Sequence, residues 1–150
     1  MLRERLNEEV KLAMKAKEAL RVSTLRLVTA AIKDKDIALR GEGKGPVDDQ
    51  GVLDLLQKMV KQRRDSIQAF EAGGRKDLAD TEQAEIDIIS AFMPAQLSDA
   101  EMASACAAVI ADVGAAGPKD MGKVMAALKE RFAGQMDFTK ASATVKQLLS

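Results

Sequence analysis

Residues 48–73 have the sequence DDQGVLDLLQKMVKQRRDSIQAFEAG, which carries the clearest helical periodicity in the chain. Asp48 and Asp49 are of the residue type that caps a first turn, and Gly73-Gly74 ends the pattern. The apolar stripe of this predicted helix consists of Val52, Leu55, Leu56, Met59, Val60, Ile67 and Phe70. A helix with one apolar face must pack against other elements, so the rest of the chain has to supply them.

The sequence on either side of this helix predicts three more amphipathic helices. Apolar residues recur at helical spacing from Leu2 and again after Glu18, and the second of these helices is expected to end near Arg40. Three glycines and a proline in residues 41–46 predict a loop there. After Gly74 a fourth helix is expected to close at Pro94, because the residue before a proline is disfavoured in the α region.

Beyond Pro94 the sequence predicts three further helices. Ser98 and Glu101 have the spacing of a capping box, which opens a helix that runs to Gly114. Another helix is expected after Gly117-Pro118, and either Asp137 or Thr139 starts the last. We found no alternating strand pattern of useful length. The sequence therefore predicts an all-α fold, with an N-terminal four-helix domain over residues 1–94 and a C-terminal three-helix domain over residues 95–150.

Composition excludes several classes of protein. The 150 residues include 23 Lys and Arg, 23 Asp and Glu, one Cys and no His, and 47% are apolar. The balance of charge and apolar content excludes a disordered chain, and a net charge of zero restricts contact with nucleic acid to local surfaces. Without His, catalytic triads and His-ligated zinc sites cannot form. The lone cysteine and the absence of a long apolar run or secretory leader favour a cytoplasmic protein with no membrane partner.

The charges are nevertheless distributed unevenly. Residues 1–40 contain 10 basic and 6 acidic side chains, a net charge of +4, whereas residues 41–95 contain 7 and 11, a net charge of −4. The favoured interpretation is two helical pairs whose faces attract each other. The alternative is a basic surface that meets RNA.

Candidate catalytic and metal-binding residues each have a simpler structural interpretation. Cys106 lies on an apolar helix face, where burial keeps a thiol protonated and unreactive. Gly45-Pro46 is not followed by the Lys-Ser/Thr of a phosphate-binding loop. Carboxylates that could share a proton or a cation crowd the fourth helix, but a solvated acidic face is favoured; they are Asp80, Glu82, Glu85 and Asp87. We therefore predict no catalytic residue, no metal and no cofactor.

Two further features allow a binding interpretation. Residues 61–64, Lys-Gln-Arg-Arg, form a compact basic patch that is either a solvent-exposed stripe or an RNA contact. Gly122 interrupts a good helical sequence, which favours close packing of another helix and leaves close approach of a ligand as the alternative.

Five strings in order along the chain resemble the GatB/YqeY family. None is specific alone, but their order and spacing together are. They are Leu25–Lys33 (LRLVTAAIK), Lys61–Ser66 (KQRRDS), Ala72–Ala79 (AGGRKDLA), Glu85–Ile89 (EIDII) together with Met93–Ser98 (MPAQLS), and Asp120–Met125 (DMGKVM).

The resemblance implies that the C-terminal part is similar to the tail of the GatB subunit of glutamine-dependent tRNA amidotransferase, a carbon–nitrogen ligase. In that enzyme the tail is associated with holding tRNA, and the chemistry lies in parts absent here. This implies an accessory module without catalysis of its own that contacts tRNA. Phe138 stands where the family pattern has glycine. The candidate RNA-binding residues are Lys119, Gly122, Lys123, Arg131 and Lys140.

Two alternatives remain open. The chain could be a protein-interaction module that binds no RNA and uses an apolar groove between its two parts, since its eight methionines suit an adaptable surface. It could also be an independent ligase or amidase, although it lacks an amidase Ser/Lys signature and a nucleotide site. DNA is not an expected partner.

Overall fold

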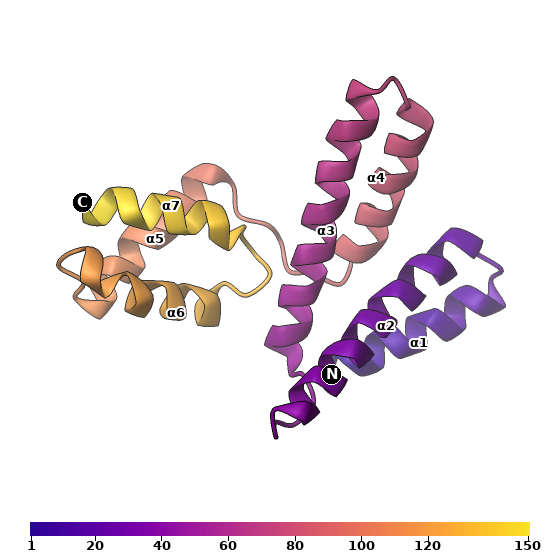
Figure 1. The fold of residues 1–150 in the computed structure, drawn as a ribbon, viewed down its shortest axis with the longest axis horizontal. Coiled ribbons are helices and arrows are strands. Elements are labelled where there is room, and N and C mark those ends of the chain that lie inside the picture. The colour runs from indigo at the N-terminus through magenta and orange to yellow at the C-terminus, as the bar shows by residue number, and fades with distance from the viewer. The chain divides into compact units, whose positions relative to one another are not determined.

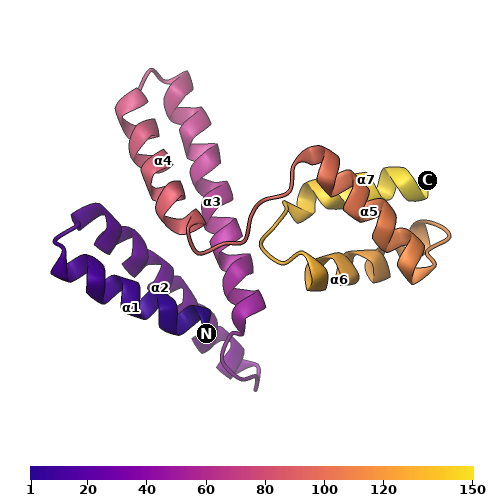
Figure 2. The same cartoon turned by 180° about the vertical axis from the view of Figure 1, so that it is seen from behind.

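The computed structural model describes residues 1–150 and is entirely helical (Figures 1 and 2). Its seven α-helices and one short 3-10 helix confirm the predicted all-α class. The α-helices are α1 Leu2–Lys15, α2 Ala19–Gly41, α3 Asp49–Ala72, α4 Lys76–Ser90, α5 Asp99–Val113, α6 Met121–Arg131 and α7 Phe138–Leu149, and the 3-10 helix η1 is Pro118–Asp120.

The chain divides into two compact units, Met1–Met93 and Pro94–Ser150. The first consists of two helical hairpins, α1 with α2 and α3 with α4, which are visible as indigo-to-purple and magenta pairs in Figure 1. Its buried core draws on all four helices and on the loop before α3; it comprises Leu6, Leu25, Val28, Ile32, Val47, Val52, Leu56, Val60, Ile86, Ile89 and Phe92.

In the second unit α5, α6 and α7 each pack against the other two. The core of this unit is separate from that of the first and comprises Met102, Cys106, Val109, Val124, Leu128, Met136, Ala141, Val145 and Leu149. The start of the unit is tied to the loop between α6 and α7, because the Leu97 amide donates to the Gln135 carbonyl at 2.8 Å. The Gln96 side-chain amide donates to the Gly134 carbonyl of the same loop.

Three predicted helix starts, those of α3, α5 and α7, are set by side-chain caps. Asp48 accepts from the Gly51 amide at 2.8 Å, and Ser98 and Glu101 form the predicted capping box. Asp137 rather than Thr139 caps the last helix, since its carboxylate accepts from the Thr139 amide at 2.8 Å.

The ends of two predicted helices differ from expectation. α4 ends at Ser90 rather than at Pro94, and the Phe92 and Met93 amides bond to carbonyls three residues back, so the chain leaves the helix through a tighter turn. The segment after Gly117 starts as the 3-10 turn η1 before α6 begins. No single helix is long and apolar enough to cross a membrane, although the bent pair Asp99–Val113 and Pro118–Arg131 meets those criteria jointly.

Because the second unit has its own core, we predict that residues 94–150 fold without the rest of the chain. The fragment should be helical and should melt cooperatively by circular dichroism, with marginal stability because a domain of roughly 60 residues buries little surface. A matched fragment that starts at Ser98 keeps the capping residue of α5 but lacks the Leu97 and Gln96 bonds, and it should melt at a lower temperature. An unfolded 94–150 fragment beside a cooperative full-length protein would show that one core serves the whole chain.

Candidate functional site

The structure brings three of the predicted RNA-binding residues together at the start of α6. Lys119 lies in η1, and Gly122 and Lys123 lie in the first turn of α6; all three are exposed. The backbone amides at a helix N-terminus carry partial positive charge, which adds to that of the two lysines. Asp120 lies between them, and its carboxylate accepts from the Ala116 amide at 2.9 Å and so holds the preceding loop.

Gly122 has open space around it. A Cβ atom built at this position would meet no heavy atom within 4 Å outside its own helical turns. The favoured interpretation of Gly122 as a site of close helix packing is therefore wrong for the helices of this chain. The residue also lies in the first turn of α6, not in a helix interior, so its cost to helix stability is smaller than the sequence suggested.

The other two predicted cations lie elsewhere in the second unit. Arg131 ends α6, about 12 Å along the helix axis from Lys123 at 1.5 Å per residue. Its guanidinium is paired with the Asp112 carboxylate at 2.8 Å, so part of its charge is already balanced. Lys140 is exposed in the first turn of α7, which follows α6 after a short loop. The five candidate residues therefore form one compact group and two outlying cations.

The predicted basic patch and the predicted acidic cluster meet in the first unit. Arg63 of α3 donates to the Glu85 carboxylate of α4 at 2.9 Å, and the two side chains are only 12% and 17% exposed. This pair lies within one hairpin, as does the Arg21–Glu9 pair of α1 and α2 at 3.0 Å. These contacts therefore stabilise each hairpin internally, and they do not join the net-positive pair of helices to the net-negative one.

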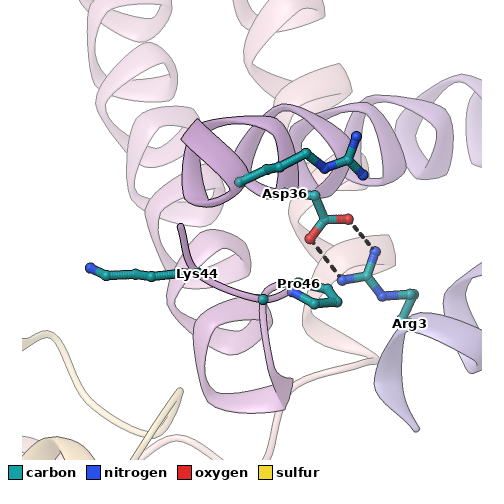
Figure 3. A pocket seen from close by; sticks show the side chains of 6 residues that line it. Arg3, Asp36, Lys44 and Pro46 are labelled. Atoms are coloured by element: carbon teal, nitrogen blue, oxygen red, sulfur yellow. Dashed lines mark hydrogen bonds and ion pairs between the residues drawn. The ribbon is translucent and has the colours of Figure 1, made fainter. Parts of the chain in front are cut away.

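Sequence reasoning missed a polar pocket at the end of the first hairpin (Figure 3). It is a hollow of about 360 Å³ lined by Arg3, Asp36, Arg40, Lys44, Gly45 and Pro46. Arg3 donates to both oxygens of Asp36, at 2.6 and 2.9 Å, and to the Val47 carbonyl at 3.0 Å. The Val47 amide donates to Asp36 at 2.9 Å. Arg3 and Asp36 are 33 residues apart, so no local pattern could have paired them.

These bonds remove Asp36 from acid–base chemistry. The hydrogen bonds from Arg3, followed by that from the Val47 amide, lower the pKa of Asp36 from 3.8 to about 2. Lys44 extends away from the pocket in Figure 3 and pairs with Glu42 at 2.9 Å. The pocket therefore contains an ion pair whose two members bond to each other and to the Val47 backbone, and these bonds fix the loop before α3.

Cys106 is fully buried in the core of the second unit. Desolvation raises the pKa of its thiol, as the sequence interpretation of a structural cysteine requires. No group of three or more His, Cys, Asp or Glu side chains has an arrangement that could hold a metal ion.

The fold defines a small all-α protein of two compact helical units. The chain belongs to the YqeY-like protein family, whose model it matches over residues 3–149. This agrees with the resemblance drawn from the five strings.

The chain is also similar to curated proteins named "Altered inheritance of mitochondria protein 41, mitochondrial". It is 40% identical over 88 residues to the protein of Saccharomyces cerevisiae strain S288c, an alignment that covers 59% of this chain and 46% of the relative. It is 40% identical over 90 residues to that of Eremothecium gossypii, covering 60% and 48%. The Lachancea thermotolerans protein is 38% identical over 88 residues, covering 59% and 46%. The chain thus spans slightly less than half the length of these relatives.

The pKa of Asp36 generates a prediction for acid stability. Asp36→Asn should lower the urea midpoint at pH 7, because the amide loses the charge-assisted bonds from Arg3. A carboxyl group whose pKa is lowered by folding stabilises the folded state at pH values above its ordinary pKa, which is 3.8 for Asp36. This stabilisation is lost as the pH falls toward the folded-state pKa of about 2. The difference in urea midpoint between the wild type and Asp36→Asn should therefore become smaller as the pH is lowered through this range. Asp34→Asn, which changes an exposed carboxylate on the same helix, should show no comparable gap at any pH.

Burial of Cys106 generates a second prediction. In native protein the thiol should react with a disulfide reagent only as fast as the second unit opens. Cys106→Ala should cost about 1–2 kcal/mol of unfolding free energy through the cavity it leaves. Cys106→Ser should cost more, because it buries a hydroxyl. Rapid labelling of the folded protein would contradict this account.

Proposed function

We propose that this protein is a non-catalytic accessory module that contacts tRNA through its second unit. The proposal starts from the resemblance of that unit to the tRNA-associated tail of the GatB subunit, and it treats the two compact units as separate four-helix and three-helix domains. Family membership fits this origin but does not itself report RNA binding.

The observation that carries the proposal is that the start of α6 is exposed and that the space beside Gly122 is open. Lys119 and Lys123 flank Gly122, and neither lysine has an ion-pair partner. Phosphate contacts supply most non-specific affinity for nucleic acid, and small residues let the sugar-phosphate backbone approach the helix. Lys140 extends the contact at the far end of the unit, while Arg131 contributes less because Asp112 already holds it.

The residue types support binding rather than catalysis. A chain without His has no side chain that titrates near neutral pH unless a pKa is strongly shifted, and its one thiol is buried. We therefore expect no release of ammonia from glutamine and no independent carbon–nitrogen ligase activity. A reducing compartment, the cytoplasm in the sequence-based expectation, suits the lone thiol.

The tRNA proposal predicts salt-dependent binding. Wild-type protein should bind bulk tRNA at about 50 mM salt, and Lys119→Ala, Lys123→Ala and Lys140→Ala should each weaken binding and reduce the logarithmic salt slope by roughly 0.7–0.9. Arg131→Ala should have a smaller effect. Lys58→Ala, which removes an exposed cation of α3 in the first unit, is the matched control and should leave affinity unchanged.

Gly122→Ala separates a binding role from a structural one. The open space at this position and the higher helix propensity of alanine predict equal or greater thermal stability. Affinity for tRNA should fall if the backbone of Gly122 lies close to the RNA. No tRNA binding by the wild type at low salt would overturn the proposal and favour a protein-interaction module.

A further inference from the structure

The outer face of α2 carries apolar side chains that no other helix of the first unit covers. Leu20, Leu27 and Ile37 are 39%, 52% and 59% exposed, whereas core residues of the same types, such as Leu25 and Ile32, are almost completely buried. In heptad register Leu20 and Leu27 are a positions and Ala30 and Ile37 are d positions, while Ser23 and Asp34 hold the remaining d and a positions of this stretch. Four of the six a and d positions are therefore apolar, which is typical of a helix that packs along another helix, and polar residues interrupt the pattern at the other two. We call these four residues the α2 seam.

A row of cations borders the α2 seam on one side. Arg26, Lys33 and Arg40 also recur every seven residues, at the g positions that flank the seam. All three are exposed and none lies within ion-pair distance of a carboxylate, although Arg40 also lines the pocket at Asp36, where its charge acts on that carboxylate. The Arg26 guanidinium reaches only the Met14 sulfur, at 3.6 Å. On the other side of the seam lie Ala31 and Ala38, which are small enough for a second helix to approach closely.

We propose that the α2 seam docks an amphipathic helix of a partner protein that carries acidic residues along one flank. The apolar side chains would cover the partner's apolar stripe, and the three exposed cations would meet its carboxylates. The seam spans 18 residues from Leu20 to Ile37, about 27 Å, which suits a helix of roughly three heptads. This inference concerns the first unit, goes beyond the tRNA proposal and does not depend on it.

Other occupants fit these residues less well. An RNA backbone offers no apolar surface to Leu27 and Ile37. A bilayer would have to bury Asp34, which stands at the a position between them, whereas a helical partner tolerates one polar residue at such a position. A second copy of α2 offers no acidic flank. In an antiparallel pair its cations would oppose one another, and in a parallel pair they would face Ala31 and Ala38.

The test uses two designed peptides of about three heptads, with Leu at a and d and either Glu or Lys at e and g. Each is titrated against the full-length protein by fluorescence anisotropy. The Glu peptide should bind and the Lys peptide should not. The triple variant R26E/K33E/R40E should lose at least about tenfold in affinity for the Glu peptide and should gain affinity for the Lys peptide. The double variant L27S/I37S should bind the Glu peptide more weakly than the wild type does.

The matched control is K58E/K61E/R64E, which reverses three exposed cations on α3, a helix with no large exposed apolar residue. It should bind the Glu peptide as the wild type does. All substitutions are at exposed positions, and circular dichroism checks that each variant keeps its fold.

Several outcomes would overturn the proposal. These are no binding of the Glu peptide, an equal loss in the α3 control, which indicates general charge attraction, or no effect of L27S/I37S. Concentration-dependent dimers abolished by L27S/I37S would assign the seam to a second copy of the chain. Loss of tRNA affinity in R26E/K33E/R40E without loss of peptide affinity would assign the cations to RNA. Failure of the Lys119 and Lys123 variants to affect tRNA binding would overturn only the tRNA proposal.

Discussion

The ion pair between Arg3 and Asp36 fixes the arrangement of the first hairpin and of the loop that follows it. Arg3 comes from the first turn of α1 and Asp36 from the last part of α2, so their two bonds set how far one helix lies along the other. Both residues also bond to the backbone of Val47, whose side chain lies in the core just before α3. One charged cluster thus joins both helices of the first hairpin to the loop that leads into α3. Both charges and both Val47 backbone groups have hydrogen-bond partners. These bonds therefore offset most of the free energy that it costs to remove the two partly buried charges from water.

The two units expose surfaces of different kinds. The first exposes apolar side chains beside cations on α2, a combination suited to a protein helix. The second exposes lysines and a glycine without an apolar stripe at the start of α6, a combination suited to phosphate. An accessory protein that holds an RNA with one unit and a protein with the other would need no catalytic group.

Local patterns predicted the helices well because their causes are local. The caps at Asp48 and Ser98 are formed by residues three positions apart, and an apolar period of 3.6 is independent of tertiary structure. Burial of Cys106 followed from its place in such a stripe. The all-α class therefore required no knowledge of how the helices pack.

Contacts between distant residues were beyond prediction for the opposite reason. The Arg3–Asp36 and Arg63–Glu85 pairs depend on which helices become neighbours, and the sequence gives each of these residues several equally charged alternatives. Gly122 illustrates the same limit, since its sequence context favoured packing although the space around it is open. Of the predicted site, the proximity of Lys119 to Lys123 could be derived from spacing, whereas the pairing of Arg131 with Asp112 could not.

The central claim is that tRNA contacts the start of α6, and amide chemical shifts recorded during a tRNA titration test it most directly. Isotope-labelled full-length protein at low salt should show its largest changes at Lys119, Gly122 and Lys123, with smaller ones near Lys140. The amides along α3 should stay unchanged. Shifts confined to the first unit, or no shifts at saturating tRNA, would contradict the claim.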